Sequence, residues 1–461
     1  MKFLLLRVGS NRKAYFFMSQ SYYPPLGLLY IGAALEHDGH NVEIIDFCNE
    51  INIEKHLENS LISSDAVGIT VDAGNYESVS DIAKIIKGID PAIPIIIGGP
   101  HNTYLPERSL NDISNADISV RGEGEQVIID IARFIEGKKN LSEIPGIHYR
   151  ENNTIKKGKE IEIIENLDSL YYPARHLTDK YEYGKINNQH LFKPKFTTME
   201  TSRGCPHNCR FCRRPNNSIP GYGFRQRSAE NVVNEIIEIN ERYGTVGIVD
   251  DNFLANKKRA IDILQKLIDN GTDINLIIHG ARVDSADPDI YKKMKKANVK
   301  LISYGLESGN QDVLDFYNKN ITLDQVRRAV NLSREMGFIT IGSFILGAPI
   351  ETKKHIENTI RFAYSLPLDI AFFVPLKYLI GSPLWIDAVK DNKINEEEYV
   401  VPADSCRNLG NFTKDELFEK AIKAEKNFYL RPRYIFDQIY MSIYRRNFMF
   451  LKNGFRVITS Y

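Results

Sequence analysis

Short apolar runs alternate with amphipathic segments over about the first 135 residues of the chain. Strands are predicted at residues 3–8, 41–46, 66–70, 93–97 and 117–120, and helices at 26–36, 76–87 and 123–135. This alternation is typical of an α/β domain in which helices cover both faces of a parallel sheet. A ligand site is expected in the crevice beyond the carboxyl ends of the strands.

A second series of strands and helices begins at residue 197. Its apolar runs predict strands at 197–201, 246–250, 276–279, 300–304, 340–346 and 370–376, with helices between them. Six βα units in succession predict a partial (β/α)6 barrel of the TIM type, with its chemistry at the carboxyl ends of the strands.

The stretch from about residue 140 to 195 loses this rhythm. Two short strand patterns flank Asn152-Asn153 and suggest a hairpin, and the polar, Pro-containing sequence that follows reads as a linker. We therefore expect four parts, an N-terminal domain at 1–140, a linker at 141–195, a barrel at 196–400 and a helical C-terminal extension at 401–461.

Charge and length narrow the function classes. The 461 residues are enough for two or three domains, and 59 basic residues balance 59 acidic ones. Without a basic bias, we expect no nucleic-acid partner. The first apolar run is too short for a secretory signal, and no run is long enough to span a membrane, so the cytoplasm is the expected compartment.

Three of the five cysteines lie within eight positions, at Cys205, Cys209 and Cys212, whereas Cys48 and Cys406 stand alone. In a reducing compartment, such a group is more often ligating than disulfide-bonded. Three thiolates on one loop can hold three corners of an iron–sulfur cubane and leave one iron open to a small molecule. Structural zinc is the weaker alternative, since zinc favours four ligands, usually in pairs such as Cys-x-x-Cys.

The spacing Cys-x-x-x-Cys-x-aromatic-Cys, just after the first barrel strand, resembles the signature of the radical S-adenosylmethionine (SAM) superfamily. The resemblance implies a 4Fe–4S cluster on these cysteines and SAM on the open iron. It also implies a protein electron donor such as flavodoxin or ferredoxin, and cleavage of SAM to a 5′-deoxyadenosyl radical. The residues then expected to contact SAM follow successive strands: Phe211, Asp250, Arg282, Glu307 and Gly347.

Three of these residues also have ordinary structural interpretations. Asp250 could belong to a turn with solvated acids, and Arg282 could be a surface arginine. Gly347 could equally mark close packing of the backbone. For Glu307, a carboxylate at the carboxyl end of a barrel strand, binding to the ribose hydroxyls is the favoured interpretation.

The N-terminal part resembles the flavodoxin-like (Rossmann-like) cobalamin-binding domains that are attached to some radical SAM enzymes. The resemblance rests on Pro24-Pro25-Leu26-Gly27, on Gly98-Gly99-Pro100-His101 and on Gly122-Glu123-Gly124-Glu125. It implies that cobalamin is bound at Pro25, Leu26, Gly27, Thr70, Gly99, His101 and Glu123. The motif Asp-x-His-x-x-Gly is missing, so no His ligand from that motif is expected on cobalt. The alternative is a domain that binds nothing and shapes the substrate cavity.

These features make the chain similar to class B radical methyltransferases and to the anaerobic magnesium-protoporphyrin IX monomethyl ester oxidative cyclase. We expect methylation of an unactivated carbon of a small-molecule or lipid-like substrate. Ring formation or rearrangement is the first alternative, and a non-catalytic iron–sulfur or cobalamin-binding protein is the second. The sequence does not identify the substrate or a catalytic side chain.

The C-terminal tail mixes arginines with aromatic residues between residues 430 and 448. One interpretation is a helix docked on the barrel, with arginines that reach water along its surface. The other is a helix in peripheral contact with a membrane.

Overall fold

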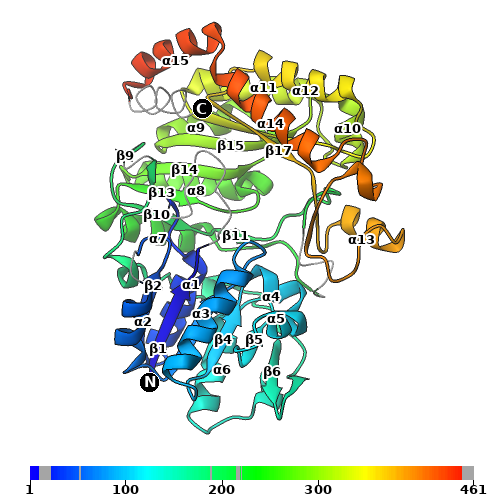
Figure 1. The fold of residues 1–461 in the computed structure, drawn as a ribbon. Coiled ribbons are helices and arrows are strands. Elements are labelled where there is room, and N and C mark those ends of the chain that lie inside the picture. Colours follow the sequence, from blue (N-terminus) through cyan, green and yellow to red (C-terminus); the bar gives the residue numbers. More distant parts are fainter. Residues whose placement is uncertain (10–21, 51–52, 187–188, 214–218, 220, 449–461) are drawn as a thin grey trace. The chain divides into compact units, whose positions relative to one another are not determined.

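The computed structural model describes residues 1–9, 22–50, 53–186, 189–213, 219 and 221–448 (Figure 1). The chain divides into two compact units. The first comprises Met1–Tyr183 and Pro215–Tyr222, and the second comprises Gly184–Arg214 and Gly223–Tyr461. The end of the predicted C-terminal extension, from residue 449 onward, lies outside the described residues.

The first unit is built on a seven-stranded sheet of order β2-β1-β3-β4-β5-β6-β7. Five strands are parallel: β1 (Lys2–Arg7), β2 (Asn41–Asp46), β3 (Ala66–Thr70), β4 (Ile95–Gly98) and β5 (Ile118–Val120). The order 2-1-3-4-5 confirms the flavodoxin-like class. The direction of the strand order reverses at β1 and β3, the position where such folds bind ligands.

The predicted hairpin forms but does not belong to a linker. Its strands β6 (Ile147–Glu151) and β7 (Thr154–Lys157) extend the sheet in antiparallel fashion beyond β5. Ile147 and Tyr149 alternate into the core beside the helices, and this burial fixes the hairpin to the first unit. The predicted boundary at residue 141 was therefore too early.

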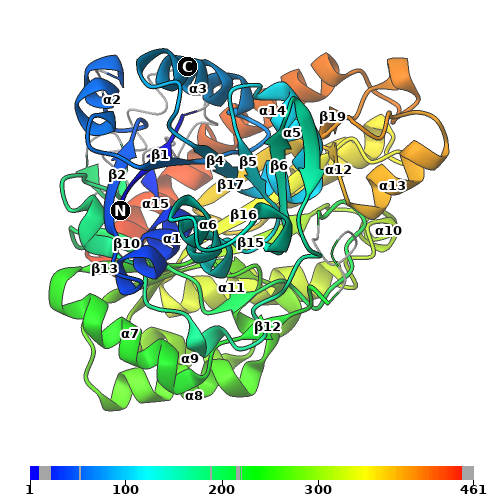
Figure 2. The same cartoon turned by 90° about the horizontal axis from the view of Figure 1, so that it is seen from below.

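Alternating residues of β1 divide the core of this unit between the two faces of the sheet. Leu4 and Leu6 pack toward α2 (Ile53–Leu61), α3 (Tyr76–Ile89) and α5 (Pro106–Asp112). Phe3 packs on the opposite face toward α1 (Leu26–His37) and α6 (Glu125–Ile135), which lie side by side in Figure 2. Because both faces are covered, the strands read as continuous apolar runs.

The true linker runs from residue 158 to the end of the first unit and is fastened to it. The Ala174 backbone N–H donates to the Leu29 carbonyl at 3.0 Å. The Tyr183 hydroxyl donates to the carboxylate of Asp46 at 3.0 Å, and Arg7 lies 3.3 Å from the same carboxylate. Asp46 is fully buried at the carboxyl end of β2, so the linker is fixed at the ligand edge of this sheet.

The second unit contains the predicted partial barrel. Its six parallel strands follow chain order: β10 (Phe196–Met199), β13 (Thr245–Ile248), β14 (Asn275–Ala281), β15 (Val299–Glu307), β16 (Ile339–Leu346) and β17 (Ile370–Pro375). The connecting helices are α7 (Ala229–Arg242), α8 (Lys257–Asp269), α9 (Pro288–Lys296), α10 (Gln311–Phe316), α11 (Leu323–Met336) and α12 (Lys353–Ser365). In α7, Ser228 caps the first turn by accepting from the Asn231 backbone N–H.

After β17 the chain adds α13 (Pro383–Lys390), α14 (Lys414–Tyr429) and α15 (Pro432–Arg445). Helix α15 is held at the amino-terminal edge of the barrel by Asp369, which precedes β17 and is buried. Arg445 lies 2.7 and 2.8 Å from the two carboxylate oxygens of Asp369, and Gln438 donates to one of them at 3.0 Å. The predicted helical tail is thus docked on the barrel. No helix in the described ranges has the length and apolar character needed to cross a bilayer.

Candidate functional site

The three-cysteine loop follows β11 (Ser202–Arg203), directly after the first barrel strand. Gly204 has a φ of +78°, and a Cβ there would lie 2.9 Å from the Gly223 carbonyl oxygen. A residue with a side chain is therefore disfavoured where the loop leaves the strand. Cys209 is buried, whereas Cys205 and Cys212 are half-buried.

Two other segments of the barrel unit, residues 317–318 and the start of α13, hold this loop in place. The Arg210 backbone N–H donates to the Tyr317 carbonyl at 2.9 Å, and its carbonyl accepts from the Leu384 N–H at 2.9 Å. The Asn318 side chain donates to the Asn208 carbonyl at 2.8 Å. The cysteines therefore stand on backbone fixed by the barrel.

The thiols influence one another electrostatically. Burial raises the pKa of Cys205, and it raises the pKa of Cys212 to about 12, with smaller contributions from Asp251 and the neighbouring thiolates. No three His, Cys, Asp or Glu side chains within the described ranges gather around a single point as ligands of one ion would. In a cubane each thiolate binds its own iron, whereas a structural zinc ion usually takes four ligands at one point.

Asp250, predicted to contact SAM, is buried and bound to its own protein. Its carboxylate accepts from the Thr201 backbone N–H at 2.6 Å and from the Ser202 hydroxyl at 2.6 Å. Burial raises the pKa of Asp250. These bonds tie the end of β13 to the start of the cysteine loop. The charge of the exposed Asp251, which the sequence analysis passed over, acts on Cys205 and Cys212 instead.

Arg282 is buried just after β14 and bridges two segments. Its guanidinium lies 2.9 Å from the Asp284 carboxylate and donates to the Lys319 carbonyl at 2.6 Å. A second nitrogen of the same group lies 3.9 Å from the Cys209 sulfur. Arg282 is thus not the surface arginine of the alternative interpretation. Its guanidinium is already bound to Asp284 and Lys319, so it is not free to pair with the carboxylate of SAM.

Glu307 ends β15 in a strained conformation. Its φ is +63°, and the pairing of β15 with β16 shifts register between Gly305 and Glu307. The Lys319 ammonium donates to its carboxylate at 2.6 Å, and both side chains are buried. A Cβ on Gly305 would lie 2.3 Å from a Glu307 carboxylate oxygen, so this glycine makes room for the pair.

Phe211 of the cysteine loop lies beside this ion pair. The Lys319 nitrogen is 5.7 Å from the centre of the Phe211 ring, and the Tyr317 ring contacts Phe211 edge-on at 5.0 Å. The Tyr317 hydroxyl is buried and has no hydrogen-bond partner within the described part of the chain. Residues 317–319 therefore join the site, although no sequence motif pointed to them.

Gly347 follows β16 with a φ of +104°. A Cβ there would lie 2.5 Å from the Leu417 side chain of α14, as the close-packing interpretation expects. The N–H groups of Gly347 and Ala348 donate to one oxygen of Glu351 at 2.6 and 2.8 Å. Burial raises the pKa of Glu351 to about 7. Glu351 is a second residue that the sequence analysis missed.

In the first unit, the residues predicted to bind cobalamin follow the carboxyl ends of the parallel strands. Pro25, Leu26 and Gly27 begin α1 after β1, and Thr70 ends β3. Asn75, not predicted, ties these two ends together because its side-chain amide donates to the carbonyls of Val8 at 2.9 Å and Thr70 at 3.2 Å.

Gly99 and His101 follow β4, and both make packing contacts within the first unit. Gly99 has a φ of +119°, and a Cβ there would lie 2.7 Å from the Val71 carbonyl oxygen. The His101 ring is buried and stacks on Tyr76, with ring centres 5.5 Å apart. A loop role for His101 therefore fits better than a role as cobalt ligand.

The loop after β5 is partly occupied by the linker. The Glu123 carboxylate accepts from the Ile164 backbone N–H at 2.9 Å, and a Cβ on Gly122 would lie 2.4 Å from the Ile161 side chain. Gly27 differs, since a Cβ there would meet none of the described residues within 4 Å.

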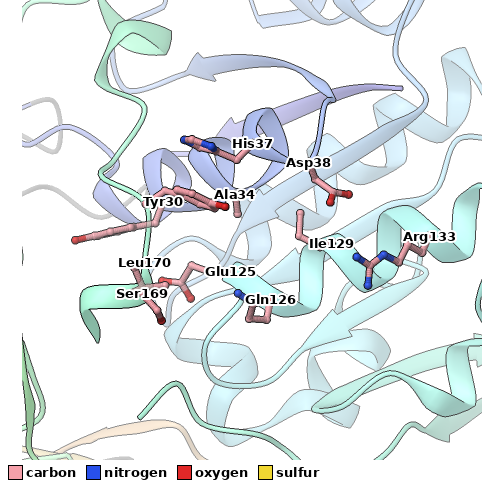
Figure 3. Close-up of a pocket in the computed structure, with 11 residues that line it drawn as sticks. Tyr30, Ala34, His37, Asp38, Glu125, Gln126, Ile129, Arg133, Ser169 and Leu170 are labelled. Carbon is pink, nitrogen blue, oxygen red and sulfur yellow. The ribbon is translucent and has the colours of Figure 1, made fainter. Parts of the chain in front are cut away.

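A small cavity of about 160 Å³ lies between α1 and α6 (Figure 3). His37 of α1 and Glu125 and Arg133 of α6 line it together with Leu170 of the linker. Its volume is well below the roughly 300–1,000 Å³ of sites for drug-sized ligands. Its lining includes none of the residues predicted to bind cobalamin.

Comparisons with known proteins assign both units. Residues 199–363 match the radical SAM superfamily, and residues 12–132 match the B12 binding domain. An uncharacterized methyltransferase of Pyrococcus horikoshii is 33% identical over 429 residues, which cover 90% of each chain. The anaerobic magnesium-protoporphyrin IX monomethyl ester cyclase of Cereibacter sphaeroides is 24% identical, over 89% of this chain and 67% of its own length.

One solved structure with a similar fold is the radical SAM methyltransferase TsrM from Kitasatospora setae, with cobalamin and a 4Fe–4S cluster bound. It matches 85% of this chain and 78% of its own with a TM-score of 0.71 and 17% identity. The chain thus belongs to the radical SAM enzymes that carry a B12-binding domain, whose cofactors are a 4Fe–4S cluster, SAM and cobalamin.

Proposed function

We propose that this enzyme is a cobalamin-dependent methyltransferase that acts on an unactivated carbon of a small-molecule or lipid-like substrate. When bound, the cluster supplies the electron that cleaves SAM, and cobalamin supplies the methyl group. The observation that carries the proposal is the 33% identity, over 90% of both chains, to a protein named as a methyltransferase.

Cys205, Cys209 and Cys212 are the proposed cluster ligands. They come from one loop whose backbone is hydrogen-bonded to residues 317–318 and to α13, and a loop held in this way supports the proposed ligand role. The other two cysteines are placed elsewhere, Cys48 in the first unit and Cys406 at an exposed position of the second. Three ligands leave one iron open to the amine and carboxylate of SAM.

The ion pair of Glu307 and Lys319 is the proposed SAM-binding group beside the cluster. The Glu307 carboxylate can accept from ribose hydroxyls, and the Lys319 ammonium suits the carboxylate of the methionyl part. Arg282 acts as a positioning residue for Lys319, because it donates to the Lys319 carbonyl. Phe211 and Gly347 remain the proposed neighbours of the adenine, and Asp250 is assigned to holding the loop.

For cobalamin, we propose the edge formed by Pro25, Leu26, Gly27, Thr70 and Gly99, with Glu123 at its linker side. At the start of α1, a Cβ on Gly27 would meet none of the described residues within 4 Å, and this supports a place for a bulky group. Because the His101 ring is packed against Tyr76, we expect no imidazole ligand to cobalt from this loop.

Ring formation is a second candidate function, favoured by the 24% identity to the cyclase over 89% of this chain. Both reactions would use the same residues of the barrel and an electron donor such as flavodoxin or ferredoxin. They differ in the product, since methylation adds one CH2 unit to the mass and ring closure removes hydrogen.

Methyl transfer is tested by comparing extracts of anaerobic cells with and without the gene by mass spectrometry. We expect a compound that gains one CH2 unit only when the gene is present, and that carries label from methyl-deuterated methionine. A product that loses hydrogen and carries no label would favour the cyclase instead.

Replacing Cys205, Cys209 or Cys212 by alanine should each abolish the reconstituted cluster, because each change removes one of three thiolates. Wild type should hold about four irons per chain and show thiolate-to-iron absorbance. Cys48→Ala and Cys406→Ala are the matched controls, and both variants should keep the iron content and the absorbance of wild type. Full iron content in all three loop variants would refute the ligand assignment.

Glu307→Gln and Lys319→Met should each weaken SAM binding about 10- to 100-fold, the usual worth of a lost charge-assisted hydrogen bond, while cluster absorbance remains. The double variant separates binding from structure, because it leaves no buried charge unpaired. It should fold and still bind SAM weakly. If the double variant binds SAM as wild type does, the pair is only structural.

Gly27→Phe should prevent retention of hydroxocobalamin after desalting and leave the cluster intact, because the ring would fill the open sheet edge. Gly88→Phe is the matched control. Gly88 is also a helical glycine of the first unit with nothing within 4 Å of an added Cβ, but it lies at the far end of α3. Equal cobalamin retention by both variants would place the cofactor elsewhere. Gly99 is unsuitable for this test, since its side chain would clash with the backbone.

A further inference from the structure

Helix α15 exposes a continuous apolar stripe. Phe436, Tyr440 and Ile443 are 72%, 62% and 60% exposed, and Ile439 and Tyr444 are exposed beside them. These positions recur at spacings of three and four residues, so they share one face of the helix. Figure 1 shows α15 at the outside of the barrel unit.

The opposite face of α15 is buried and combines polar residues with one apolar residue, Met441. Gln438 and Arg445 bind the Asp369 carboxylate, and the Tyr434 hydroxyl donates to the Asp369 carbonyl at 2.8 Å. A surface helix of a globular protein usually turns its apolar stripe to the core and its polar residues to water. In α15 the most exposed side chains, Phe436, Tyr440 and Ile443, are instead apolar. Tyr444, at the end of the stripe, does contact the barrel unit, because its hydroxyl donates to the Glu335 carbonyl at 3.5 Å.

Cations border the apolar stripe. Arg433 and Arg446 stand exposed at the two ends of α15, and the Lys295 ammonium of α9 lies 5.9 Å from the centre of the Tyr444 ring. Within the described part of the chain, none of these three forms an ion pair. The acidic residue of α15, Asp437, is already paired with Arg334 at 2.9 Å. Arg433, Arg446 and Lys295 outnumber the one exposed acid beside Tyr444, Glu335, so the charge around the stripe is net positive.

We propose that α15, with the adjoining end of α9, docks on the surface of an anionic lipid bilayer. The apolar side chains would enter the boundary between headgroups and acyl chains, with the tyrosines at headgroup level and the cations on lipid phosphates. A second copy of this chain fits less well, because antiparallel pairing of two α15 helices would bring Arg433 of each beside Arg446 of the other.

Docking through α15 would leave the candidate site of the barrel accessible. The helix covers the amino-terminal edge of the barrel through Asp369, whereas the cysteine loop and Glu307 lie at the carboxyl edge. Docking through α15 would leave the carboxyl edge uncovered. The proposal is independent of which reaction the enzyme catalyses.

The test is co-sedimentation of the full chain with vesicles of phosphatidylcholine containing about one-third phosphatidylglycerol. The triple variant Phe436→Gln, Tyr440→Gln, Ile443→Gln should bind at least about a hundredfold more weakly, because three apolar side chains no longer leave water. Ile62→Gln is the control variant, because it removes an apolar side chain of the first unit that is 85% exposed. This variant should bind the vesicles as wild type does.

A second pair of changes tests the electrostatic part. Arg433→Gln and Arg446→Gln should each weaken binding about fivefold at low salt, and wild type should bind pure phosphatidylcholine much less. The single tryptophan, Trp385, lies in the barrel unit, so unchanged emission shows that this unit is folded in each variant. The arginine variants decide the outcome if the triple variant does not fold.

Equal binding of anionic vesicles by wild type and the folded variants would overturn the proposal. So would a wild-type dimer, seen by sedimentation velocity without vesicles, that the triple variant converts to a monomer. That result would assign the stripe to contact between two copies of the chain.

Discussion

The buried ion pair of Glu307 and Lys319 is the constraint on which the barrel site depends. Removing two charges from water costs several kcal/mol for each, and replacing such a pair by apolar residues is often neutral or stabilising. Glu307 also adopts a φ of +63°, a conformation that costs about 1–3 kcal/mol in a residue other than glycine. Stability alone therefore gives little reason for this pair. Strain and buried charge at the same residue are typical of a functional site.

Several neighbouring residues serve to maintain this pair and the loop beside it. Gly305 leaves the space that the two side chains occupy, and Arg282 holds the carbonyl of Lys319. The same lysine lies over Phe211, between the second and third cysteines. Lys319 and Arg282 bring positive charge to a loop that carries three thiolates once metal is bound. The ion pair and the cysteine loop are thus one electrostatic unit.

The sequence predicted what depends on local pattern and missed what depends on tertiary contact. Six apolar runs with helices between them predicted the barrel correctly, and three cysteines on one loop were visible from their spacing. Lys319 was missed because it lies in an irregular stretch after α10 and reaches the site only when that stretch folds back on the cysteine loop. Asp250 and Asp251 are likewise adjacent acids that the sequence alone does not distinguish. Only the folded chain shows that the Asp250 carboxylate is the one that accepts from Thr201.

Two buried carboxylates at opposite edges of one barrel show how the fold separates stability from function. Asp369, at the amino edge, accepts hydrogen bonds from Thr340, Gln438 and Arg445, and this fastens α15 to the barrel. Glu307, at the carboxyl edge, accepts from Lys319 alone within the described part of the chain. A carboxylate has about four lone-pair sites, so Asp369 is nearly satisfied and Glu307 keeps capacity for further donors. Ribose hydroxyls are donors of the required kind. The Glu307 carboxylate has more unused lone pairs than the Asp369 carboxylate, and this difference supports the proposal that the carboxyl edge binds a ligand.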